Sequence, residues 1–172
     1  MTIEFMRDLL SKDEKITVEY KTCQYGVQED VYETVCSFSN RYGGYIIMGV
    51  EDDGTPIGIN PNMVKNMKKN FVNQLNNPEK MSPTLYLSIE DIVYEGMTLL
   101  WVYVPPTSTV EKCANRIYDR NEDGDMDITD SPIQLQNMYN RKSNTYAEHK
   151  IFPYVTTEDL RMDLMDKVRN LA

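Results

Sequence analysis

Three acidic residues, Glu14, Glu19 and Asp52, could together hold a divalent cation. Asp52 follows an apolar run, residues 45–50, which we expect to form a buried strand, and residues 16–23 alternate apolar with polar side chains as a half-buried strand does. If these two strands are neighbours, Glu19 approaches Asp52. Converging carboxylates repel one another unless Mg²⁺ or Mn²⁺ binds between them, and such a metal positions water for attack on a phosphodiester. Ordinary surface acids are the alternative interpretation.

A second acidic segment, residues 119–130, has the spacing of a calcium-binding loop. Oxygen-bearing side chains stand at loop positions 1, 3, 5, 9 and 12, Gly124 stands at position 6 and an apolar residue at position 8. A glycine at position 6 permits the sharp bend, and the carbonyl of position 7 supplies a further ligand. The alternative is an acidic hairpin that binds nothing, with its side chains bonded to their own turn. The predicted Ca²⁺ ligands are Asp119, Asn121, Asp123, Asp125, Asp127 and Asp130.

A cluster of lysines indicates a local contact with nucleic acid. Lys65, Lys68 and Lys69 lie three and four residues apart on a predicted helix, where they form either a phosphate-binding face or an ordinary solvated one. The net charge is −9 and the isoelectric point is near 4.6, which argues against a non-specific polyanion binder. Any binding is therefore expected to be weak and local. Lys21 and Arg41 complete the predicted contact set.

The periodicity of the chain predicts a mixed sheet covered by helices. Helices are expected over residues 2–10, 28–42, 62–75, 131–141 and 156–171, because apolar residues recur there at helical spacing. Strands are expected over residues 16–23, 45–50, 57–59 and 116–119, together with a hairpin, residues 85–104, that turns at Glu95 and Gly96. This alternation indicates the α+β class.

The central part of the chain resembles a known family. Its residues read Glu-Tyr-Lys at 19–21, Phe-Ser-Asn-Arg-Tyr-Gly-Gly at 38–44 and Ile-Met-Gly-Val-Glu-Asp at 47–52, with a glycine at position 54. These motifs resemble the Schlafen AlbA-type domain, also called the divergent AAA-type domain of bacterial regulators. The resemblance is specific over residues 14–58, extends to about residue 104 and is loose beyond. The chain departs from the family pattern at Tyr20, Ser39 and Arg41.

The resemblance implies an α+β domain that associates with nucleic acid. Bacterial members of the family are commonly labelled transcriptional regulators, and DNA-binding or ATP-binding proteins. In Schlafen proteins a similar domain cleaves structured RNA with three acidic residues, which Glu14, Glu19 and Asp52 match. We therefore predict a DNA-binding regulatory domain, with a metal-dependent ribonuclease as the alternative. The loop that cradles ATP phosphates in P-loop proteins, Gly-x-x-x-x-Gly-Lys-Ser/Thr, does not occur in this sequence.

Length and composition bound the remaining expectations. With 172 residues, 41% of them hydrophobic, the chain is expected to form a single Schlafen AlbA-like domain, residues 1–172, in which residues 105–172 extend the family match. The odd number of cysteines without CxxC spacing favours free thiols in a reducing compartment, so we expect a cytoplasmic protein. No apolar run is long enough to cross a membrane, and the oligomeric state stays open.

Overall fold

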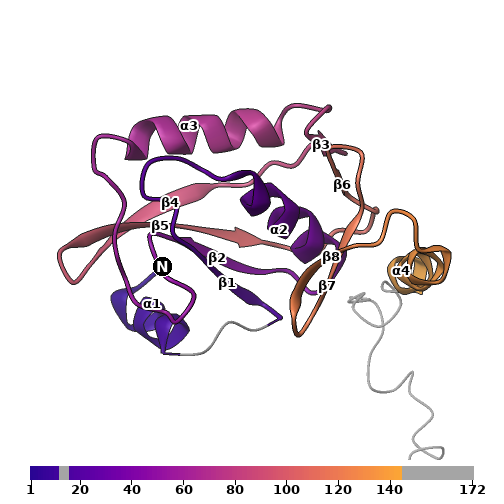
Figure 1. Cartoon of the computed structure of the whole chain (residues 1–172), viewed down its shortest axis with the longest axis horizontal. Coiled ribbons are helices and arrows are strands. Elements are labelled where there is room, and N and C mark those ends of the chain that lie inside the picture. Colours follow the sequence, from indigo (N-terminus) through magenta and orange to yellow (C-terminus); the bar gives the residue numbers. More distant parts are fainter. Residues whose placement is uncertain (12–15, 145–172) are drawn as a thin grey trace, which may run out of the picture.

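The computed structural model describes residues 1–11 and 16–144, which form a four-stranded sheet with helices on both faces. Its strands are β1 (Val18–Lys21), β2 (Gly44–Met48), β4 (Ile89–Tyr94) and β5 (Met97–Val104), in the order β1-β2-β5-β4. β1 runs parallel to β2, and the other neighbours are antiparallel. Figure 1 shows α2 (Glu29–Asn40) and α3 (Val64–Leu75) on one side of this sheet and α1 (Ile3–Leu10) on the other. The predicted α+β class, with a mixed sheet covered by helices, is confirmed.

The two faces of the sheet bury two separate sets of apolar side chains because successive residues of a strand point in opposite directions. On β2, Ile46 and Met48 pack with the helices α2 (Glu29–Asn40) and α3 (Val64–Leu75). Ile47 packs on the opposite face with α1 (Ile3–Leu10). The larger set therefore lies between the sheet and the two longer helices.

Most predicted elements are present with shorter bounds. Thr2 caps α1, since its hydroxyl accepts a hydrogen bond from the Phe5 amide at 3.2 Å. The predicted hairpin is formed by β4 (Ile89–Tyr94) and β5 (Met97–Val104), which turn at Glu95 and Gly96. The strand expected at residues 57–59 is absent from the described chain, where only an isolated bridge joins Val50 to Pro56. The helix predicted over residues 156–171 lies outside the described residues.

Two small sheets flank the main one beside α2. The strands β3 (Met81–Ser82) and β6 (Lys112–Cys113) pair with each other, and β7 (Tyr118–Asn121) and β8 (Gly124–Asp127) form a hairpin. The three cysteines are free and buried. Within residues 1–11 and 16–144, no helix is both long and apolar enough to cross a membrane.

Asn40, at the end of α2, joins the small sheets to the main body. Its side-chain amide donates to the carbonyls of Glu111 and Tyr118 at 2.9 Å each, and its oxygen accepts from the Glu111 amide at 2.8 Å. The side chain is 1% exposed, so all three bonds are formed away from water, where an unmade bond would be expensive. This geometry explains an asparagine at a position of the family motif.

The last described helix, α4 (Pro132–Asn144), is held by a buried lysine. The Lys142 ammonium donates to the carbonyls of Ser39 and Thr107 at 3.0 Å and to the carbonyl of Thr109 at 2.6 Å. Burial lowers the pKa of Lys142 from 10.5 to about 8, although the nearby Glu111 carboxylate opposes this shift. Met138 adds a buried apolar contact.

We expect the stability that Lys142 contributes to increase with pH between about 8 and 10.5. In this window the unfolded chain still holds a proton on Lys142 that the folded chain has lost, so rising pH favours folding by at most about 1.4 kcal/mol per pH unit. Urea denaturation of the native chain and of Lys142→Met at several pH values measures the difference, in which other titrating groups cancel. A difference that stays flat or falls would contradict the expectation.

Candidate nucleic-acid interface

A buried arginine, Arg120 on β7, neutralises one member of the predicted acidic triad. Its guanidinium bonds the Glu19 carboxylate at 2.5 Å and the Asp125 carboxylate at 2.7 Å, and it lies 4.8 Å from the centre of the Phe38 ring. Although burial disfavours the charge, the two carboxylates raise the pKa of Arg120 above its ordinary value. Glu19 also pairs with Lys21 at 2.8 Å. Arg120 was not predicted from the sequence. The one pattern that could have indicated it is the alternation of buried and less buried residues along β7, in which Arg120 takes a buried position.

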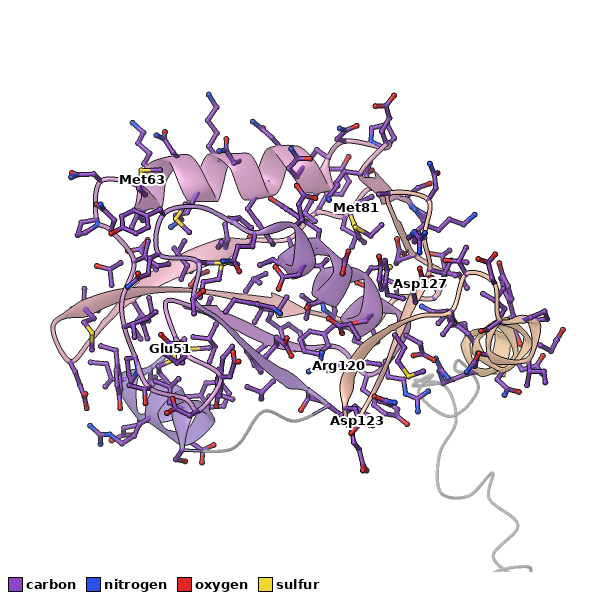
Figure 2. The ribbon with its side chains drawn as sticks, viewed as in Figure 1. Glu51, Met63, Met81, Arg120, Asp123 and Asp127 are labelled. Atoms are coloured by element: carbon purple, nitrogen blue, oxygen red, sulfur yellow. The ribbon has the colours of Figure 1, made fainter. Side chains whose placement is uncertain are left out.

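Glu19 lies on a strand of the sheet, whereas Asp52 lies in the turn beyond the neighbouring strand. The strands that carry or precede them are neighbours, as predicted, and Glu19 is in register with Ile46, so its side chain lies on the α2 face. Asp52 is exposed in the turn that follows Val50, and Gly54 at the end of this turn approaches Leu10 of α1. Figure 2 shows the neighbouring Glu51 beside α1, away from Arg120. Glu14 lies outside the described residues, so the catalytic role of the triad stays a prediction.

The predicted calcium loop is a β-hairpin, and most of the side chains predicted to bind Ca²⁺ are bonded to protein groups. Asp125 accepts from the hydroxyls of Thr34 and Ser37 on α2 as well as from Arg120. Asp123 is exposed at the tip of the hairpin (Figure 2). Residues 1–11 and 16–144 contain no group of three or more acidic, histidine or cysteine side chains that could hold a metal ion. A calcium loop is therefore not supported.

The other predicted calcium ligands confirm this arrangement of the hairpin. Asp119 is paired with Arg141 at 3.1 Å and with Arg41 at 3.5 Å. Asn121 accepts from the Asp123 amide, Asp127 pairs with Arg116 and Asp130 is exposed beyond the hairpin. Arginine side chains thus neutralise the aspartates of the hairpin, where a calcium loop would use the metal ion. These arginines come from the end of α2, from α4 and from the hairpin itself.

Two of the predicted nucleic-acid contacts are engaged inside the protein. Lys21 bonds Asp30 and Glu19 at 2.8 Å each, and although burial opposes its charge, these hydrogen bonds raise its pKa. Arg41 caps the C-terminal end of α2, where it pairs with Asp119 and lies 5.0 Å from the centre of the Tyr42 ring. We therefore place both residues with the structural ion pairs around α2.

The three predicted lysines lie together on α3, the helix that covers one face of the sheet. Met67, Phe71 and Leu75 point into the core, and this apolar stripe turns the opposite side of the helix to solvent. Lys65 and Lys69 are exposed, while Lys68 is half-buried and pairs with Asp91 of β4 at 2.6 Å. The lysine cluster predicted from the sequence is therefore a real surface feature.

A stripe of amides runs beside these lysines, and sequence reasoning missed it. The asparagines at positions 66, 70 and 73 are exposed and spaced four and three residues apart, so they lie on one line of the helix. No aspartate or glutamate occurs from Gly54 to Pro78, although the whole chain has 27 acidic residues. We call this surface the α3 face: Lys65, Lys68, Lys69, Asn66, Asn70 and Asn73.

The α3 face has the chemistry of a surface that binds nucleic acid. Lysine ammonium groups contact phosphates, which provide affinity and orientation, and asparagine amides can both donate to and accept from base edges, most favourably those of adenine. The absence of acids over residues 54–78 reduces local repulsion of phosphate, and Asp91 of β4, paired with Lys68, is an acid that the structure places against this face.

A family model described as Schlafen, AlbA_2 matches residues 4–129 of this chain. Among solved structures, the N-terminal domain of an ATP-dependent DNA helicase RecG-related protein from Nitrosomonas europaea is 27% identical, over 60% of this chain and 72% of that chain, with a TM-score of 0.49. The DIP2311 protein from Corynebacterium diphtheriae is 16% identical over 73% of this chain, with a TM-score of 0.53, and shares its fold. That match takes in 29% of the longer protein. No curated protein matches the chain.

Proposed function

The chain belongs to the Schlafen AlbA_2 family, and we propose that it is a DNA-binding regulatory domain that contacts duplex DNA through the α3 face. The observation that carries this proposal is that residues 54–78 contain no acid, and that lysines and asparagines lie side by side on the exposed side of α3 in a chain of net charge −9. The family resemblance leads us to expect nucleic-acid binding, and the α3 face is the surface to which we assign it.

The shape of the α3 face favours duplex DNA over duplex RNA. The major groove of B-DNA is wide enough to admit an α-helix, whereas the deep, narrow major groove of A-form RNA is not. A helix of twelve residues that is solvated along one side can lie in or across the DNA groove. Lys65 and Lys69 would then contact phosphates, and the asparagine stripe would face base edges or sugar–phosphate oxygens.

Binding is expected to be weak, because the rest of the protein repels DNA. Only two or three lysines contact phosphate, and Lys68 must share its charge with Asp91. Such a small set gives affinity that depends on salt, since each phosphate contact releases a bound counterion. A partner protein or a second copy of the domain would increase the effective affinity by adding contacts.

Replacing Lys65, Lys68 and Lys69 together by alanine should weaken binding to duplex DNA at low salt by tenfold or more, about the effect of losing two to three phosphate contacts. Fluorescence anisotropy of a labelled 20-base-pair DNA duplex measures the change, and an RNA duplex of the same sequence should bind more weakly to the native chain.

The matched control replaces three exposed cations elsewhere, Arg7, Lys112 and Arg116, by alanine. This control removes the same charge from other parts of the surface. If it weakens DNA binding as much as the lysine variant does, the effect is one of net charge and the α3 face is not the binding site.

The structure gives less support to the ribonuclease alternative. A metal-dependent nuclease needs free carboxylates that converge, whereas the Glu19 carboxylate bonds Lys21 and Arg120, and Asp52 lies in the exposed turn after Val50. We therefore favour the binding function over a Mg²⁺- or Mn²⁺-dependent reaction at these residues.

A further inference from the structure

An uncharged groove lies on the α1 side of the sheet, opposite α3. It encloses about 510 Å³ between α1 and the start of β2, and its lining contains no charged residue. Aromatic side chains dominate its walls: Tyr45 pairs in register with Tyr103 across β2 and β5, and the Phe5 ring stands edge-on to Tyr45 at 5.4 Å.

The aromatic walls of this groove are open to solvent. Tyr42 is 55% exposed, Tyr103 is 45% exposed and Phe5 is 38% exposed. Aromatic rings gathered on one face stabilise a structure most when they are covered, and contiguous exposed apolar surface marks a site of interaction. The sheet face that α1 covers is therefore incompletely covered by the residues that the structure describes.

The end of α4 is fixed beside the rim of this groove. Arg141 donates to the Asn40 carbonyl at 3.1 Å and Lys142 donates to the Thr107 carbonyl at 3.0 Å. Asn40 precedes the groove residue Tyr42 by two positions, and Thr107 follows the groove residue Tyr103 by four. Four residues of extended chain span at most about 14 Å, so both carbonyls lie near the groove. The chain that continues after Asn144 thus starts close to the groove.

The continuing chain contains a run whose chemistry matches the lining. Residues 151–155 read Ile-Phe-Pro-Tyr-Val, which are large, mostly apolar and uncharged. Residues 145–150 separate this run from α4 and can reach roughly 23 Å when extended. We propose that the 151–155 segment of the same chain binds in the groove, with Phe152 and Tyr154 packing against the rings of Tyr42, Tyr45 and Tyr103.

The single tryptophan of the chain, Trp101, reports on this contact in the full-length protein. Its ring lies 6.4 Å from that of Tyr45, so an occupant of the groove shields this aromatic cluster from water. Replacing Phe152 and Tyr154 together by alanine should shift Trp101 emission to longer wavelength and increase its quenching by acrylamide. Tyr139→Ala on the exposed side of α4 is the matched control and should leave both unchanged.

A double-mutant cycle and a measurement of mass in solution distinguish the 151–155 segment from a second copy of the chain as the occupant of the groove. If the 151–155 segment covers the groove, the effects of Tyr42→Ala and of the double alanine variant on the free energy of unfolding should be non-additive. The native protein should also be a monomer at every concentration. Unchanged emission and additive effects would overturn the proposal. Quenching that falls as a dimer forms at higher concentration would assign the groove to a second copy instead. DNA binding at the α3 face, on the other side of the sheet, should survive the double alanine variant in either case.

Discussion

Replacing Arg120 by methionine should lower the free energy of unfolding by about 3–5 kcal/mol, because it leaves the Glu19 and Asp125 carboxylates without their shared buried cation. Arg120 is 4% exposed, so water cannot replace the lost bonds without opening the contact between the hairpin and α2. Chemical denaturation followed by circular dichroism measures the loss. If the variant proves too unstable to purify, Arg120→Lys, which keeps one charge but not the fork geometry, should fall between it and the native chain.

Arg116→Met is the matched control on the same hairpin. Arg116 pairs with Asp127 at the surface, where solvent screens the interaction, so its removal should change stability far less. Equal effects of the two substitutions would show that the buried network around Arg120 does not hold the hairpin to α2.

Replacing Gly43 by alanine should lower the free energy of unfolding by about 2–5 kcal/mol, from a backbone cost of about 1–2 and an overpacking cost of about 1–3. Gly43 has a φ of +72°, and a Cβ atom there would lie 2.5 Å from the carbonyl oxygen of Val104. The Cβ atom is fixed to the backbone and the Val104 oxygen belongs to the backbone, so no side-chain rotation can relieve the contact. Denaturation by urea measures the change.

Gly96 provides the control for this substitution because its φ is +80° and a Cβ atom there would meet nothing within 4 Å. Gly96→Ala should therefore show only the backbone cost, about 1–2 kcal/mol. Equal losses at Gly43 and Gly96 would contradict the close approach of β5 to the end of α2.

Much of the fold was predictable because local patterns and tertiary packing agree. The apolar spacing of α3 places Met67, Phe71 and Leu75 in the core as expected, and the turn at Glu95 and Gly96 joins β4 to β5. The family resemblance is confirmed as well, and the close packing at Gly43 gives a physical reason for one of its motif residues.

The hairpin of β7 and β8 could not be recognised from spacing alone. A calcium loop and a tight acidic turn both need oxygen side chains at alternate positions and a glycine at the bend. What decides between them is the position of Arg141, Arg41 and α2, which are distant in the sequence but adjacent in the structure. For the same reason the neutralisation of Glu19 by Arg120, 101 residues later, was not predictable.

The candidate interface was predictable in part. The lysines of α3 were identified by their spacing. Lys21 and Arg41 were assigned to the same set because the sequence alone does not show which cations form ion pairs within the protein. The asparagine stripe could have been found from the sequence, because its residues are spaced four and three apart on the solvent side of α3. This spacing indicates a binding surface only when it is considered together with the lysines.

The most direct test of DNA binding through the α3 face is the salt dependence of affinity for duplex DNA. With two to three lysines on phosphates, a plot of log Kobs against log salt concentration should have a slope between about −1.8 and −2.7 for the native chain. The variant in which alanine replaces Lys65, Lys68 and Lys69 should have a slope near zero. A variant that keeps the native slope and affinity would contradict the account, because its phosphate contacts would then lie elsewhere.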